Sequence, residues 1–445
     1  MKKTPLFLLV ILFTLLAKNS LEQAFSLEEA KDYAISNSLS VTEANNAIEI
    51  ARLKIAEIRG MGLPQVSLNG SFNHFINLPV SVLDAKFFNP NAADGEIISF
   101  EAGTKYTSTG AMQVNQILFN GSYIVGLQTA KLFSKLQQDV SNQSKETLVF
   151  NVIQAYQLAM ISKENKQFID SLVLISQKLV EQQQNYLDLG LITQEEVDQL
   201  KYSFLNAKTM SSSADMQMQN TLAMLKLAMG YPMNDPIEVS NTINELLNKE
   251  SISKGNDIHT NLSYSILEKQ VTLFSLNLKN NKFANLPSLN AFFQQSYNAY
   301  RNDFGLFNNE KWFSQTLWGL SLNVPVFSGF SRQSKTAQAK IELMDKENQL
   351  TQLEQHLLFQ ELQLRNNVNS AEEKLYLQKE NVALASSIYS NSITKQVIGI
   401  GNSLEVTQKH SQLMMAQTAY IGSLVDVFNA RLAIDKLYNN LLQNK

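Results

Sequence analysis

Hydrophobic residues recur with a period of 3.5 in the longest uninterrupted segments of this chain. One seam steps alternately by four and three residues and consists of Leu364, Val368, Ala371, Leu375, Gln378, Val382, Ala385 and Tyr389. A second seam with the same steps consists of Phe168, Leu172, Ile175, Leu179, Gln182 and Tyr186. Such a sustained period is typical of helices that supercoil around one another. The pattern therefore predicts long, packed helices.

Proline and glycine delimit these helical segments. No proline lies between residues 121 and 231, and none follows Pro325. A proline inside a helix costs roughly 3 kcal/mol or more, so both regions permit long helices. Gly190 lies near the middle of the first region and Gly399 near the middle of the second. Each region is predicted to hold two long helices joined at a glycine turn.

Shorter segments that precede the helical regions alternate between apolar and polar residues. They lie at 66–76, 288–297 and 318–324, with a weaker one at 105–115. Leu68 alternates with Asn69, and Leu322 with Asn323. Uncharged polar residues on one face and apolar residues on the other suit a strand between lipid and water. A strand of a soluble sandwich is the alternative for any one segment.

The N-terminus has the pattern of an export signal. Lys2 and Lys3 precede an apolar run from Leu6 to Leu16. That run is shorter than the roughly 20 residues that a spanning helix needs. Residues 1–24 are therefore predicted to be a cleavable signal peptide. No later apolar stretch is long enough to span a membrane as a helix, so we expect any crossing to use strands.

The composition excludes several classes of function. The chain has no cysteine, only four scattered histidines and a net charge of -3. It therefore offers no thiolate metal site, no cysteine nucleophile and no basic footprint for nucleic acid. No cofactor motif or acid–base pair emerges, so we expect no cofactor and no enzymatic activity. The methionines, including Met414 and Met415, are interpreted as core residues rather than as a metal site, because no histidine or cysteine joins them.

Several short motifs occur twice. Leu63-Pro64 corresponds to Leu286-Pro287, and Phe119-Asn120-Gly121 corresponds to Phe327-Ser328-Gly329, 208 residues further on. Phe119, Gly121, Phe327 and Gly329 are predicted to mark the turns from strand to helix. The tip glycines are 209 residues apart. The chain is therefore predicted to be duplicated.

Each predicted repeat contains a helix, a strand pair and a long helical hairpin. The first repeat covers 25–231, with strands at about 65–119 and a tip near 190. The second covers 258–445, with strands at about 288–327 and a tip near 399, and residues 232–257 link the two. An open sheet edge in lipid leaves backbone groups unsatisfied. Because known single-chain barrels have at least eight strands, four strands must be pooled between chains.

The export signal, the two repeats, the Phe-x-Gly turns and the glycine tips together resemble the TolC family of outer-membrane efflux proteins. The resemblance covers essentially the whole mature chain. It implies a mainly α-helical protomer of a homotrimer, with a transmembrane twelve-stranded β-barrel continued by a coiled-coil tunnel through the periplasm. It also implies outer-membrane lipid, a periplasmic adaptor and an inner-membrane pump of the RND or ABC type as partners. The implied function is a passive exit duct for small molecules or proteins.

In that family the turns between the long helices form the periplasmic entrance. The resemblance assigns adaptor docking to the two tips, at Gly190, Leu191, Gly399 and Ile400. It assigns the entrance charges to Glu196 and Glu405, each six residues after a tip glycine, whereas a further acidic position of the family is Gln408 here. Gln396 and Gly401 replace the aromatic residue and the arginine that latch the entrance in well-known members, so a latch of that kind is not expected.

The two glutamates also have a purely structural interpretation. Thr193-Gln194-Glu195-Glu196 is a capping box, and Asn402-Ser403-Leu404-Glu405 approximates one. Capping and an entrance charge are compatible, because threefold symmetry would still gather six carboxylates. A periplasmic or surface coiled-coil scaffold or adhesin without a pore is the alternative function.

Overall fold

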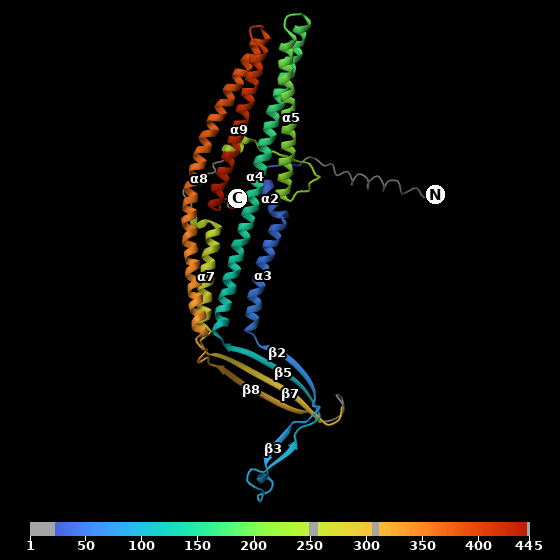
Figure 1. Ribbon diagram of the computed structural model, residues 1–445, viewed down its shortest axis with the longest axis vertical. Helices are drawn as coiled ribbons and strands as arrows, with labels where there is room; N and C mark the ends of the chain where they lie inside the picture. The colour runs from blue at the N-terminus through green and yellow to red at the C-terminus, as the bar shows by residue number, and fades with distance from the viewer. Residues whose placement is uncertain (1–22, 249–256, 305–310, 443–445) are drawn as a thin grey trace, which may run out of the picture. The chain divides into compact units, whose positions relative to one another are not determined.

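The computed structural model describes residues 23–248, 257–304 and 311–442 (Figure 1). Most of the predicted signal peptide lies outside the described residues. The main elements in chain order are α2 Leu27–Asn37, α3 Leu39–Met61, β2 Gln65–His74, β5 Tyr106–Phe119, α4 Gly121–Asp188, α5 Gln194–Met229, α7 Leu262–Phe283, β7 Ser288–Arg301, β8 Phe313–Asn323, α8 Ser331–Val397 and α9 Ser403–Leu437. The fold is mainly helical. No described helix is long and apolar enough to cross a membrane.

The two longest helices have nearly equal lengths. Helix α4 has 68 residues and α8 has 67. Since each residue adds about 1.5 Å, each helix is about 100 Å long. A second long helix follows each of them, α5 with 36 residues and α9 with 35. As predicted, one long helix precedes each tip glycine and another follows it.

The chain divides into two compact units, and each draws on both halves of the sequence. Unit 1 contains Met1–Ile48, Leu136–Glu268 and Asn348–Lys445. Unit 2 contains Glu49–Lys135 and Lys269–Glu347. In the described residues, α3-β2-β5-α4-α5 and α7-β7-β8-α8-α9 follow the same order. The duplication itself, and the boundaries of the two repeats, stay predictions.

The core of unit 1 holds its helical hairpins together. One cluster lies around fully buried Tyr156, whose hydroxyl donates to the Phe25 carbonyl oxygen at 2.8 Å. Phe25 belongs to strand β1 (Gln23–Phe25), which pairs in parallel with β6 (Ile237–Val239). The short helix α6 (Ile243–Asn248) follows β6 in the chain and contributes to the same cluster. A second cluster joins all four long helices and includes Leu172 and Tyr389.

One predicted core position in unit 1 is displaced. Ile175 belongs to the predicted seam of α4, but its side chain is 42% exposed, and the adjacent Ser176 is buried instead. An α-helix has 3.6 residues per turn, so a seam drawn with a period of 3.5 drifts around the helix unless the supercoil corrects it. Leu172 and Leu179 on either side are buried as predicted.

Unit 2 contains an antiparallel sheet with the strand order β2-β5-β7-β8. A separate hairpin of β3 (Val80–Asp84) and β4 (Ile97–Glu101) lies in the connection between β2 and β5, with the short 3-10 helix η1 (Ala85–Phe87) between them. Strand β8 ends at Asn323, earlier than the predicted 327. Pro325 explains the difference, because proline lacks the N–H that would continue the ladder.

Candidate functional site

The register of the sheet places apolar and polar residues on opposite faces. Directly paired residues point to the same side of a sheet. Val66 pairs with Val114, Val114 with Phe293, and Phe293 with Trp318. One residue away, Ser67 pairs with Gln113, and Gln113 with Gln294. The alternation predicted for each strand is thus aligned across β2, β5 and β7, whereas Gln294 pairs with Leu317, so β8 adds an apolar residue to the polar face.

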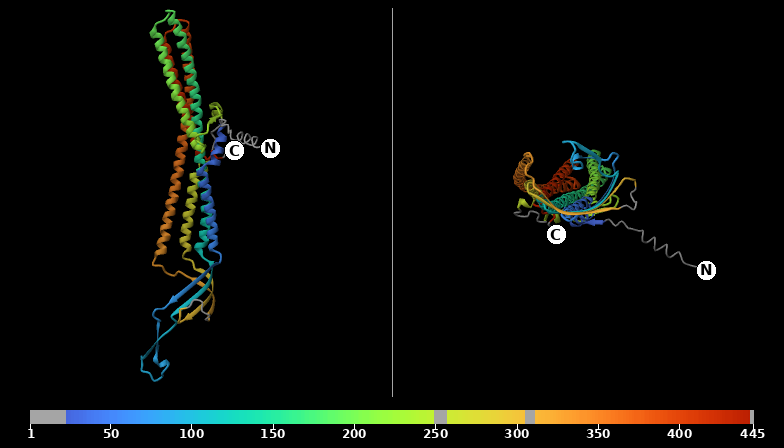
Figure 2. Two further views of the ribbon diagram at one scale, coloured as in Figure 1. Left: turned by 90° about the vertical axis from the view of Figure 1, so that its right-hand side faces the viewer. Right: turned by 90° about the horizontal axis from the view of Figure 1, so that it is seen from below.

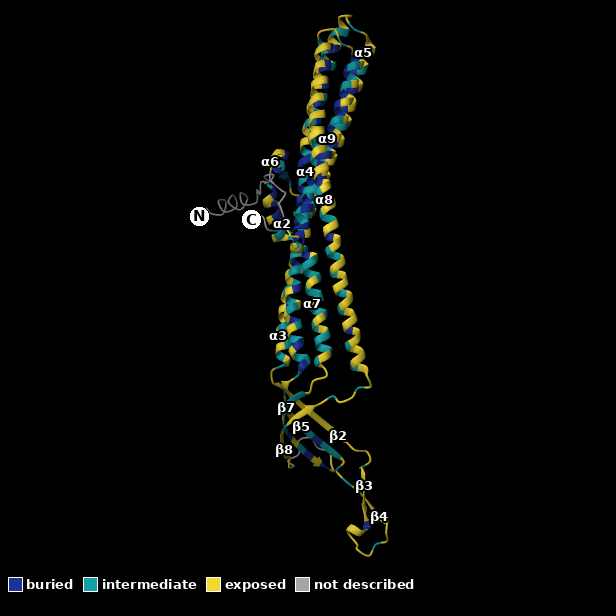
Figure 3. Ribbon diagram, turned by 90° about the vertical axis from the view of Figure 1, so that its left-hand side faces the viewer, coloured by how far each residue is buried: buried dark blue, intermediate teal, exposed yellow. Residues whose placement is uncertain are grey.

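The apolar face is exposed rather than packed. Leu68 is 82% exposed and Trp318 is 74% exposed, and every residue of β2 is exposed (Figure 3). The outer edges of β2 and β8 pair with no strand among the described residues. A soluble protein buries such a surface or avoids it. The sheet therefore has one face suited to lipid, one suited to water, and two edges that can accept further strands.

The two turns between the long helices have the same backbone geometry, and Figure 2 shows both at one end of unit 1. Gly190 has φ +72° and Gly399 has φ +81°, in the left-handed region. The amide N–H of Leu191 donates to the Tyr186 carbonyl oxygen at 2.9 Å, and that of Ile400 donates to Lys395 at 3.0 Å. The glycine N–H groups donate to carbonyl oxygens three residues back. Both turns are Schellman motifs.

Both tips expose apolar side chains beside their glycines. Leu191 is 69% exposed and Ile400 is 74% exposed. In a Schellman motif the residue after the glycine usually packs back on its own helix. Exposure at both tips leaves these side chains available to another molecule.

Glu196 is an N-terminal cap of helix α5. Its Oε2 accepts the Thr193 amide N–H at 3.0 Å, and the Glu196 N–H donates to the Thr193 hydroxyl at 3.4 Å. The capping box predicted from the sequence is therefore present. The carboxylate also lies at the positive end of the helix dipole.

Glu405 has different partners from Glu196. The cap of α9 is Asn402, whose side-chain oxygen accepts the Glu405 N–H at 2.7 Å. The Glu405 carboxylate instead lies 3.8 Å from the Lys395 ammonium group on α8. Gln408, one turn further along α9, is exposed. The approximate capping box around Glu405 is thus only half formed.

A buried polar contact lies just below the tips. The Gln396 side-chain amide on α8 donates to the Gln183 oxygen on α4 at 3.4 Å and to the Ser403 hydroxyl at 3.3 Å. All three residues are buried. At Gly401, an added Cβ would lie 2.8 Å from the backbone nitrogen of Gln396. No side chain fits at 401, which gives a physical reason for the absence of the latching arginine.

The two predicted strand-to-helix turns differ in detail. Strand β5 ends at Phe119 and α4 begins at Gly121, where an added Cβ would lie 2.9 Å from the Phe283 carbonyl oxygen. Gly329 has open space around it but a φ of +59°, and α8 begins two residues later. Phe327 is exposed in the connection to α8. Glycine is required at both turns, for close approach at one and for backbone conformation at the other.

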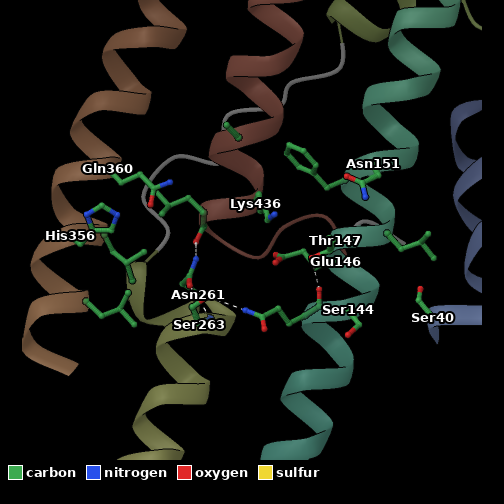
Figure 4. A pocket seen from close by; sticks show the side chains of 17 residues that line it. Ser40, Ser144, Glu146, Thr147, Asn151, Asn261, Ser263, His356, Gln360 and Lys436 are labelled. Atoms are coloured by element: carbon green, nitrogen blue, oxygen red, sulfur yellow. Dashed lines mark hydrogen bonds between the residues drawn. The ribbon is translucent and has the colours of Figure 1, made fainter. Parts of the chain in front are cut away.

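Unit 1 also contains a polar cavity of about 830 Å³ that the sequence did not indicate (Figure 4). Glu146, His356 and Lys436 line it from α4, α8 and α9, and Asn261 lines it from the residue just before α7. Burial raises the pKa of Glu146 to about 7, and the positive charge of Lys436 acts in the opposite direction. Glu146 and Asn261 are more than a hundred positions apart in the sequence, so the periodicity of the sequence could not predict that they line one cavity. No group of residues fit to hold a metal ion occurs in the described part of the chain.

Comparison with known families found a match for a segment in the second half of the chain. Residues 271–440 match the family model described as outer membrane efflux protein. This segment is an outer membrane efflux protein domain. The domain includes most of α7, both strands β7 and β8, the Gly399 tip and the whole of α8 and α9. The resemblance to the TolC family is therefore confirmed.

Solved structures of outer-membrane channel proteins share the fold over most of the chain. The outer membrane protein VceC from Vibrio cholerae has 13% identity and a TM-score of 0.69, with 93% of this chain and 95% of that chain covered. CusC, whose structures describe its folding and transmembrane channel formation, has 14% identity and a TM-score of 0.75, with 94% of this chain and 95% of that chain covered. The CmeC outer membrane channel of Campylobacter jejuni has 14% identity and a TM-score of 0.66, with 93% and 85% covered. No protein of curated function matches the sequence.

The family match covers the second of the two tips but not the first. The efflux domain includes Gly399, Ile400, Glu405 and Gln408, whereas the first tip lies outside it. At such identities the solved structures support the fold of the first half and not the roles of its residues. Docking, entrance and turn roles therefore stay predictions for both tips.

Proposed function

We propose that this efflux-family protein is the outer-membrane channel of a tripartite efflux or type I secretion system. The observation that carries the proposal is the four-stranded sheet with an exposed apolar face, a polar face and two open edges. In lipid such edges must pair, and four strands are too few to close alone. Three copies would supply a twelve-stranded barrel with the apolar face toward lipid and the polar face toward water.

The long helices suit the remainder of such a duct. Helices of about 100 Å, without membrane-spanning character in the described residues, would extend from the barrel into the periplasm. The two glycine tips would meet a periplasmic adaptor, and through it an inner-membrane pump of the RND or ABC type. The cargo would be small toxic molecules or proteins, which would pass without chemical change.

Fractionation of expressing cells tests the proposal. We expect the mature protein in the outer-membrane fraction, released by mild detergent as a homotrimer and able to form conducting pores in planar bilayers. A stable monomer in membrane extracts would exclude the pooled barrel. A periplasmic coiled-coil assembly without conductance would instead establish the scaffold or adhesin function.

The entrance charges give a further prediction. We expect the double variant Glu196→Gln and Glu405→Gln to assemble normally and to lose cation selectivity, because six carboxylates would no longer surround the axis. Glutamine can still complete the capping box of Thr193, so helix α5 stays capped. The exposed pair between Lys395 and Glu405 contributes at most about 1 kcal/mol, so its loss should not disturb assembly.

Reversal potentials in a salt gradient measure this selectivity. Gln408→Glu provides the matched gain of charge and should increase cation preference, with the effect decreasing at high salt. If the double variant keeps the reversal potential of the natural protein, both glutamates are structural only.

A further inference from the structure

Three of the four helix ends that adjoin the sheet of unit 2 are rich in basic residues, and the fourth, at the start of α4, is uncharged. The ten residues of α3, α4, α7 and α8 closest to the strands are 52–61, 121–130, 274–283 and 331–340. Their basic residues are Arg52, Lys54, Arg59, Lys279, Lys282, Arg332, Lys335 and Lys340, and their only acidic residue is Glu57. The whole chain, in contrast, has 37 basic and 40 acidic residues. The positive charge is therefore concentrated beside the sheet.

Ion pairing accounts for only two of these charges. Arg52 pairs with Glu49, and Lys54 pairs with Glu57. The other six form no ion pair with the described residues, and we call them the strand-proximal basic residues: Arg59, Lys279, Lys282, Arg332, Lys335 and Lys340. Lys279 donates a hydrogen bond to Gln128, which is uncharged.

Helix dipoles explain some of the strand-proximal basic residues but oppose others. Arg59 and Lys282 lie in the last turns of α3 and α7, where a positive charge is favourable. Arg332 and Lys335 lie in the first two turns of α8, where the dipole is also positive and disfavours them. The first turn of α8 contains no acidic residue. An external negative charge would offset this unfavourable placement.

A groove between α7 and α8 combines two of these lysines with apolar side chains. It has a volume of about 640 Å³ and is lined by Lys282, Lys340, Leu278, Leu343 and Met344, among others. Glu347 also lines it, but this residue is 16 positions from the start of α8, or about 24 Å along the helix. Lys282 lies one residue from the end of α7, and Lys340 lies closer to the strands than Leu343 and Met344, so the end of the groove near the strands is cationic, as the phosphate of a phospholipid requires.

We propose that the groove and the strand-proximal basic residues bind anionic phospholipid in the periplasmic leaflet of the outer membrane. This inference rests on the proposed function, which places the strands in lipid and these helix ends at the periplasmic surface. The headgroup layer is roughly 5–7 Å deep, and charges act over a Debye length of about 8 Å. Lys340 is nine residues into α8, about 14 Å along it, and the other five lie closer to the strands.

Spin-labelled lipids test the proposal on the reconstituted trimer. We compare phosphatidylglycerol with phosphatidylcholine as labelled probes in phosphatidylcholine vesicles, and measure the motionally restricted fraction of each. The trimer should prefer phosphatidylglycerol, and the preference should decrease with salt. The variant Lys282→Gln, Arg332→Gln, Lys335→Gln and Lys340→Gln should reduce it about fivefold or more, since one basic residue near an anionic surface is worth about fivefold.

Matched variants separate this effect from a general loss of charge. Lys178→Gln, Lys201→Gln, Lys208→Gln and Lys379→Gln remove the same charge from exposed positions of unit 1 and should leave the preference unchanged. Replacement of Lys282, Lys335 and Lys340 by arginine, which keeps the charge, should preserve it as well.

Each contrary result has a separate meaning. A protein that does not insert as a trimer contradicts the proposed channel and this inference together. A conducting trimer whose lipid preference survives the fourfold substitution contradicts only the lipid site. Two further results also overturn it: altered ion selectivity with normal lipid preference places the charges in the water-filled interior, and dissociation of the trimer makes the groove a subunit contact.

Discussion

Leu68→Arg should abolish assembly in the outer membrane, whereas Asn69→Arg at the adjacent position should assemble and change conductance. Leu68 lies on the apolar face near the middle of β2, and Asn69 lies on the polar face. Arginine on the lipid face costs roughly 2–4 kcal/mol near the bilayer midplane. Because a trimer contains three copies, the total is roughly 6–12 kcal/mol, comparable with the stability of a whole domain.

The position along the strand provides an internal control for the Leu68 prediction. Leu322 is also on the apolar face but is one residue from the end of β8, which in the proposed barrel would lie near the membrane surface. There the same substitution costs only about 0–1 kcal/mol. Leu322→Arg and Asn323→Arg should therefore both assemble. The amount of trimer in outer-membrane extracts measures each variant, and equal losses at Leu68 and Asn69 would contradict the assigned faces.

Gly190→Val and Gly399→Val should abolish export while trimers persist in the membrane. Both glycines have φ values in the left-handed region, which costs other residues roughly 1–2 kcal/mol and β-branched residues more. The Schellman hydrogen bonds that shape the tips depend on this conformation. The four long helices bury their own core below the tips, so the damage should stay local. Export of a fluorescent dye and cross-linking to the adaptor measure the effect.

Two further substitutions separate tip geometry from loss of glycine. Asparagine tolerates the left-handed conformation, so Gly190→Asn and Gly399→Asn should keep export. Gly422 lies within α9 with nothing within 4 Å of an added Cβ and no positive φ, so Gly422→Val should also be neutral. Normal export by the two tip valine variants would remove the docking role.

The elements and their faces follow from local patterns. Proline-free runs predicted α4 and α8 because one interior proline would have broken either helix. Alternation predicted the faces of the strands because a one-residue shift of register would invert every side chain. The tip glycines could also be predicted locally, because a left-handed residue between two helices favours glycine.

What could not be predicted depends on residues distant in sequence. Glu196 and Glu405 occupy equivalent places, yet only Glu196 completes its cap, because the Glu405 carboxylate lies instead near Lys395 on the preceding helix. The requirement for glycine at residue 121 comes from Phe283, and the exposure of Ile175 comes from the way that α4 packs. The sequence contains these residues, but not the distances between them.

The buried contact between Gln183 and Gln396 has a consequence for the length of the helical hairpins. The two amides lie seven and three residues from their tip glycines and face one another across α4 and α8. Inserting one heptad into a single hairpin would preserve its apolar seam. It would also separate the amides, and the buried Gln183 amide would lose its partner at a cost of roughly 1–3 kcal/mol, whereas Gln396 would keep Ser403. The hairpins can therefore be lengthened together but not singly, and their tips stay at one level.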